Sequence, residues 1–157
     1  MPGKGIDHST CPKARVVRSL WTDPEKAFAQ VLMKAFVKKV NVFIKVSVLD
    51  VISLDAAEPD KKRLFFWRDI LGDKHFDYVV CRRETLEPLL AVELDDPTTG
   101  RRRSTTADDV KATAARHAAF PIVRFAVGAT FTPELVRAKL IAEYRVVRAG
   151  ALPEEMG

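Results

Sequence analysis

The stretch FDYVVCRRETLEPLLAVELDD, residues 76–96, decides the fold of this chain. Two apolar segments, 76–80 and 89–94, flank the polar segment 82–88. Short apolar runs bounded by turn-prone residues are typical of strands, and a short connection favours antiparallel pairing. The stretch therefore predicts a hairpin of two buried strands.

Each strand of this predicted hairpin carries an acidic side chain. Side chains alternate between the faces of a strand, so Glu93 and Asp95 share one face and Asp77 can face the same side. An ionised carboxylate removed from water needs a compensating partner. Carboxylates suit a hard divalent cation, so we predict an Mg²⁺ or Mn²⁺ site formed by Asp77, Glu93 and Asp95. The alternative is that these acids lie exposed at the margins of the sheet.

The sequence on both sides of the hairpin predicts an α/β fold of order αβββαβα, with a mixed sheet flanked by helices. Helices are expected where apolar residues recur at helical spacing after a capping residue, and strands where β-branched residues cluster. The expected elements are a helix opened by the capping box Thr22-x-x-Glu25, a strand over 42–48 continuing toward Ile52, a short helix over 64–71, a helix capped by Thr106, a strand over 122–127, and a last helix opened by Thr132.

The chain of 157 residues, 47% of them hydrophobic, is long enough for one domain with a substantial core. We expect a flexible tail over 1–20, the domain over 21–147 and a C-terminal tail over 148–157. No apolar run approaches the length of a membrane span, and the N-terminus lacks the pattern of a secretory signal, so we expect a cytoplasmic protein. Cys11 in the tail and Cys81 in a turn are expected to be free thiols.

The chain carries 26 Lys and Arg against 21 Asp and Glu, a net charge of +5. Its cations cluster in predicted loops around the acidic centre, which is compatible with a polyanionic partner, although for any single cluster a solvated loop is the favoured explanation. The aromatic residues Phe65, Phe66 and Trp67 are expected in the core rather than as a platform for unpaired bases. The clusters predicted to contact nucleic acid are Lys61, Lys62, Arg63 and Arg101, Arg102, Arg103.

Asp77, the run Glu93-Leu94-Asp95-Asp96 and Asp108-x-x-Lys111 together resemble the bacterial family called domain of unknown function 2726. The resemblance runs from about Trp21 to Tyr144. That family is assigned to the PD-(D/E)XK, or restriction-endonuclease-like, superfamily, near the very-short-patch repair endonucleases. The resemblance implies a restriction-endonuclease-like fold and an Mg²⁺-dependent nuclease that cleaves phosphodiester bonds in DNA.

In that reading Asp77 and Glu93 hold the metal, and Asp95 is a ligand or orients a water. The superfamily usually has a lysine two positions after the second acid, and here that position is Asp95. Lys111 takes over the role of that lysine, or it is a solvated surface lysine, which explains its presence equally well. Glu25 points toward the metal from the first helix, or serves only its capping box. Arg124 is expected to pair with one of the acids.

The sequence also lacks the His that commonly follows the Asp-Asp doublet, a group that could act as general acid or base. Two alternatives therefore stay open: a catalytically inactive nucleic-acid-binding module of the same fold, and a protein-interaction subunit. No membrane partner is expected, and assembly as a homodimer or larger complex is left open.

Overall fold

The computed structural model describes residues 12–36, 39–95, 108–149 and 153–156. The expected mixed α/β fold is confirmed. Among the described helices, none is both long enough and apolar enough to cross a membrane. The elements are α1 Asp23–Phe36, β1 Val40–Ser47, α2 Val48–Val51, α3 Lys61–Gly72, β2 His75–Arg82, β3 Pro88–Asp95, α4 Asp108–His117, β4 Ile122–Ala126, α5 Pro133–Arg148 and the 3₁₀ turn η3 Glu154–Met156.

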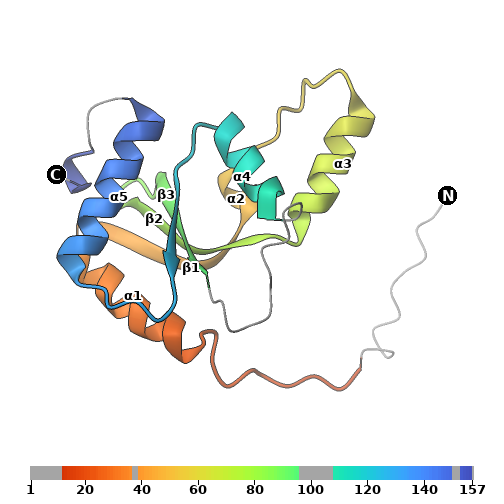
Figure 1. Ribbon diagram of the computed structural model, residues 1–157. Coiled ribbons are helices and arrows are strands. Elements are labelled where there is room, and N and C mark those ends of the chain that lie inside the picture. Colours follow the sequence, from red (N-terminus) through yellow and green to blue (C-terminus); the bar gives the residue numbers. More distant parts are fainter. Residues whose placement is uncertain (1–11, 37–38, 96–107, 150–152, 157) are drawn as a thin grey trace.

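The four strands form one sheet in the order β1-β2-β3-β4. The strands β1, β2 and β3 are successively antiparallel, whereas β3 and β4 are parallel and are linked through α4. Figure 1 shows α1 and α5 on one face of the sheet and α2, α3 and α4 on the other. The predicted hairpin of β2 and β3 is therefore confirmed and lies at the centre of the sheet.

Two hydrophobic cores lie on opposite faces of the sheet. The first joins α1 and α5 to the sheet through residues such as Leu32, Tyr78 and Leu140. The second joins α2, α3 and α4 to the other face, with Leu71 and Phe76 completely buried. Strand residues fill both cores because successive side chains point to opposite faces.

Three details of the predicted elements differ in the structure. The first strand ends at Ser47 rather than continuing to Ile52, because the chain turns into α2 and buries Val48 in the second core. Cys81 is a buried residue of β2 and not a turn residue. The short helix expected over 64–71 exists and begins earlier, at Lys61, where the Asp60 carboxylate caps it by accepting from Arg63 N.

The C-terminal segment contacts the first core through Met156, whose side chain is completely buried. The Arg137 guanidinium on α5 donates to the Met156 carbonyl at 3.2 Å. The segment expected to be a tail therefore packs on the domain at this residue. No periodic pattern near the C-terminus predicts such a contact, since it depends on a single apolar side chain.

Met156→Ala should lower the free energy of unfolding by about 2 to 5 kcal/mol, because it removes a buried side chain and leaves a cavity. Met33→Ala is the matched control: Met33 is 49% exposed on α1, so its truncation should change stability by less than about 0.5 kcal/mol. Urea unfolding of both variants measures the difference. Equal stabilities of Met156→Ala and the parent would mean that the C-terminal segment does not contribute to the core.

Candidate active site at the opening between β2 and β3

The pairing between β2 and β3 stops where the predicted acids begin. The register runs to the pair Tyr78↔Val92, and continuing it would place Asp77 opposite Glu93. Instead, the Asp77 side chain enters the gap, and its Oδ2 accepts a hydrogen bond from Leu94 N at 2.9 Å. Beyond this point β2 pairs with β1, and β3 pairs with β4. The sheet therefore opens at the two acids.

Lys45 joins the first acid of this opening to the first helix. Its ammonium donates to Asp77 Oδ1 at 3.1 Å and also to Glu25 Oε1. Glu25 at the same time accepts from the backbone N of Thr22 at 2.7 Å, so the predicted capping box is present. The Tyr78 hydroxyl donates to the Glu25 carbonyl at 2.6 Å and fixes α1 against β2. Glu25 thus serves both as a helix cap and as a member of the site.

Lys111 forms the second cationic contact, with the acid of β3. Its ammonium lies 2.8 Å from Glu93 Oε1 and 2.9 Å from the carbonyl of His75. The two side chains are only 13% and 10% exposed. Lys111 is therefore not a solvated surface lysine, and α4 delivers its charge to the same opening.

The carboxylates of the opening interact electrostatically. Burial raises the pKa of Glu93, and the negative charge of Asp77 raises it further, while Lys111 and Arg124 act against this increase. For Glu25, burial alone would raise the pKa, but hydrogen bonds from Lys45 and Thr22 lower it overall. The Lys45 pKa is raised, because its bonds to Glu25 and Asp77 outweigh the effect of burial.

Asp95 is held differently from the other predicted ligands. Its Oδ1 lies 3.2 Å from Arg124 Nη1, and its side chain is 39% exposed at the end of β3. Arg124 is also the neighbour of Glu93 in the parallel ladder between β3 and β4. The expected pairing of Arg124 with an acid is confirmed, because its guanidinium pairs with Asp95 while its backbone neighbours Glu93.

The donor atoms can be compared with the needs of a hard cation. Within the described residues, no group of three or more His, Cys, Asp and Glu side chains is arranged to hold a metal. Mg²⁺ commonly takes one or two carboxylates and completes its shell with water and phosphate oxygens, so Asp77 and Glu93 supply the kind of ligand that it prefers. Their ammonium partners, Lys45 and Lys111, would have to move away from these oxygens.

The two ammonium partners decide how the metal-free protein responds to the loss of an acid. If the acids had no partners, Asp77→Ala or Glu93→Ala would relieve repulsion and leave stability unchanged or higher. In the structure, each acid has a lysine partner. Deleting either carboxylate leaves an ammonium without its partner, so both substitutions should destabilise the metal-free protein.

The predicted nucleic-acid-binding residues are only partly described. Arg101, Arg102 and Arg103 lie outside the described residues. Lys61 donates to the Ala56 carbonyl at 2.8 Å, and Arg63 pairs with Glu58 at 2.6 Å, whereas Lys62 lies exposed on α3. Neither of these two contacts joins Lys61 or Arg63 to the opening.

Sequence reasoning missed Lys45 as a site residue. Its signal is a lone cation inside the β-branched run 42–48, on the strand that pairs with the one carrying Asp77. Its backbone φ of 49° is unusual for a residue other than glycine. Such conformations cost on the order of 1 to 3 kcal/mol and persist only where the surroundings enforce them, here through the two carboxylates of Glu25 and Asp77.

The opposite pKa shifts predict opposite pH dependences for two variants. The pKa of Glu93 is higher in the folded protein than in the unfolded chain, so the protonated carboxyl stabilises the fold at low pH. This stabilisation is lost as the pH rises through the pKa of Glu93 in the folded protein. Glu93→Gln removes that loss, so its unfolding free energy should rise relative to the parent as the pH rises above about 4. Glu25 has a lowered pKa and stabilises the fold above the unfolded value, so Glu25→Gln should fall relative to the parent as the pH rises.

Urea unfolding of the two variants and the parent across this pH range provides the measurement. If the unfolding free energies of both variants changed with pH in the same direction relative to the parent, the opposite pKa shifts of Glu93 and Glu25 would be contradicted.

Comparison with known protein families gives a match. The family described as a protein of unknown function (DUF2726) matches residues 17–143, a span that includes every residue of the opening. Searches of curated proteins and of solved structures find no match. Because the match covers most of its length, the chain belongs to the DUF2726 family.

Proposed function

We propose that this domain is an Mg²⁺-dependent nuclease that hydrolyses phosphodiester bonds in DNA. The observation that carries the proposal is the opening of the sheet at Asp77 and Glu93, where one acidic side chain replaces a backbone partner and both are close enough to interact electrostatically. Charged groups with perturbed pKa values at such an opening are candidates for a functional site. The resemblance of the motifs to restriction-endonuclease-like enzymes supports the same reaction.

Asp77 and Glu93 would hold the cation in this proposal. A bound Mg²⁺ would activate a water molecule and neutralise negative charge that develops on the phosphate. Water adds its oxygen to phosphorus, the bond to the leaving sugar oxygen breaks, and that oxygen takes a proton. The products are a terminal phosphate and a free hydroxyl.

The cationic side chains have a separate role in this proposal. Lys111, once it leaves Glu93, retains a positive charge at the opening and can contact a phosphate oxygen. Lys45 occupies the equivalent position beside Asp77. Arg124 neutralises Asp95 and contributes positive charge beside Glu93, so four acids face three cations in this region.

A second candidate function is nucleic-acid binding without cleavage. The pairs Lys45–Asp77 and Lys111–Glu93 favour it, because each carboxylate already has a partner without metal. A binding module of this kind would bind DNA with an affinity that falls as salt rises. It would not cleave DNA in the presence of Mg²⁺, and Mg²⁺ would not change its stability.

The conservative variants Asp77→Asn and Glu93→Gln test the nuclease. Each removes a charged ligand while preserving side-chain size, so Mg²⁺-dependent cleavage of DNA should fall by more than about 100-fold, beyond the loss typical for residues that only support a ligand. Cleavage of labelled single- and double-stranded DNA with Mg²⁺, Mn²⁺ or EDTA provides the measurement.

Glu87→Gln is the matched control. Glu87 directly precedes β3, at the end of that strand opposite to the opening, and its carboxylate pairs with Arg82 at 2.7 Å. It should cleave like the parent. Unchanged cleavage in the Asp77 and Glu93 variants, or equal cleavage in EDTA, would contradict the proposed site. Binding without cleavage under every condition would favour the second candidate.

A further inference from the structure

The outer side of α3 carries two exposed phenylalanines. Phe65 and Phe66 are 62% and 61% exposed, which contradicts their expected place in the core. The inner side of α3 already packs through Leu71, Trp67 and Ile70 on the second core. The helix is therefore anchored without the two phenylalanines, and their rings are available for a ligand.

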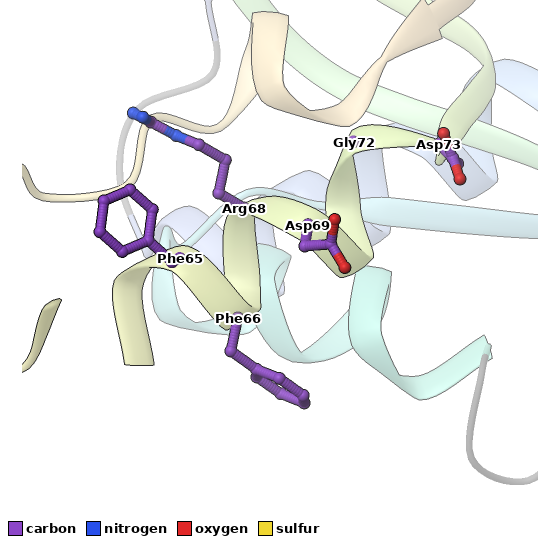
Figure 2. A pocket seen from close by; sticks show the side chains of 6 residues that line it. All are labelled: Phe65, Phe66, Arg68, Asp69, Gly72 and Asp73. Atoms are coloured by element: carbon purple, nitrogen blue, oxygen red, sulfur yellow. The ribbon is translucent and has the colours of Figure 1, made fainter. Parts of the chain in front are cut away.

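The two rings border an open hollow on α3. Figure 2 shows Phe65 and Phe66 projecting from the helix in different directions, with Arg68 extending on the side of Phe65. Asp69, Gly72 and Asp73 line the other end of the hollow. The aromatic surface thus lies at the start of the helix, and the acidic surface lies at its end.

Positive charge accompanies the aromatic half of α3. Lys62 precedes Phe65 by three residues and Phe66 by four, so it neighbours both on the helix surface. Arg68 follows Phe65 by three residues, and both cations are exposed. Aromatic faces next to cations are the chemistry that holds stacked bases and their phosphates. The acids Asp69 and Asp73 would repel phosphates, which confines a bound strand to the first half of the helix.

We infer that α3 binds unpaired nucleotides of single-stranded DNA, with bases stacked on Phe65 and Phe66 and phosphates beside Lys62 and Arg68. The inference rests on the proposed function and specifies it, because it names an unpaired segment as the preferred substrate. The geometry is compatible with one strand reaching both places: α3 leads directly into β2, which carries Asp77, and it lies on the same face of the sheet as α4 with Lys111 (Figure 1).

A second copy of the chain is a less suitable occupant. A symmetric dimer would bring the same patch of each subunit together, so the rings would have to pack on the partner's rings, and the cations could be matched only by Asp69 and Asp73 at the far end of the helix. A nucleic-acid strand brings the opposite charge and the planar groups that exposed phenylalanines stack on.

The double variant Phe65→Ser/Phe66→Ser tests the platform. Fluorescence anisotropy of labelled oligothymidylate of about 12 nucleotides, in EDTA and at low salt, measures binding without cleavage. Loss of stacking on two rings should weaken binding by about 10-fold or more. Leu135→Ser is the matched control, because Leu135 is also 62% exposed but lies on α5, across the sheet. It should bind like the parent.

Lys62→Gln and Arg68→Gln test the proposed phosphate contacts. Each should reduce the slope of log affinity against log salt by about 0.7, the change expected for one phosphate contact on a single strand. Binding of a blunt duplex should not depend on the two phenylalanines, because paired bases are not free to stack on them. Melting curves of all variants should match the parent, since the substituted side chains are exposed.

Three outcomes would overturn the inference: parental binding by the double variant, equal weakening in Leu135→Ser, or a parental dimer that the double variant dissociates while oligothymidylate binding is unchanged. The last would assign the patch to self-association. Failure of the proposed nuclease function would look different from failure of this inference. The parent would then show no cleavage, while its binding in EDTA would still depend on the two phenylalanines.

Discussion

The carboxylate of Asp77 occupies the place at which two central strands separate, and the candidate site depends on this arrangement. One oxygen accepts the backbone N–H of Leu94, and the other accepts the ammonium of Lys45. A backbone N–H at a broken ladder needs a partner, because an unsatisfied buried donor costs about 1 to 3 kcal/mol. Asp77 supplies that partner and at the same time places negative charge between β2 and β3. Structure and charge are therefore coupled in one side chain.

Glu93 shows the energetic cost of placing a carboxylate at this opening. Its carboxylate is buried in a strand that pairs on its other side with β4, and its raised pKa records the penalty for ionisation there. Lys111 compensates by donating both to Glu93 and to the His75 carbonyl. Buried ion pairs of this kind are seldom more stabilising than apolar residues of the same size. The pair is therefore better suited to the proposed role at the opening than to stabilising the fold.

The hairpin and the acids on it were predictable because their signals are local: apolar runs, a polar connection and alternation. The partners of the acids were not. Lys45 bridges residues 20 and 32 positions away along the chain, and the half-buried state of Lys111 depends on how α4 packs against β2. Phe65 and Phe66 were assigned to the core by composition alone, whereas one turn of packing by Trp67, Ile70 and Leu71 already anchors α3. Local sequence therefore predicted the elements and the acids, but not the contacts made by packing.

The most direct test of the account is a crystal structure of the protein soaked with Mn²⁺, with anomalous diffraction used to locate the metal. We expect one strong peak within bonding distance of the Asp77 and Glu93 carboxylates, with the Lys111 ammonium displaced from Glu93. A structure without a peak at this position, in which Lys45 and Lys111 still bridge to their carboxylates at saturating Mn²⁺, would contradict it. The opening between β2 and β3 would then be a network of ion pairs that supports the fold.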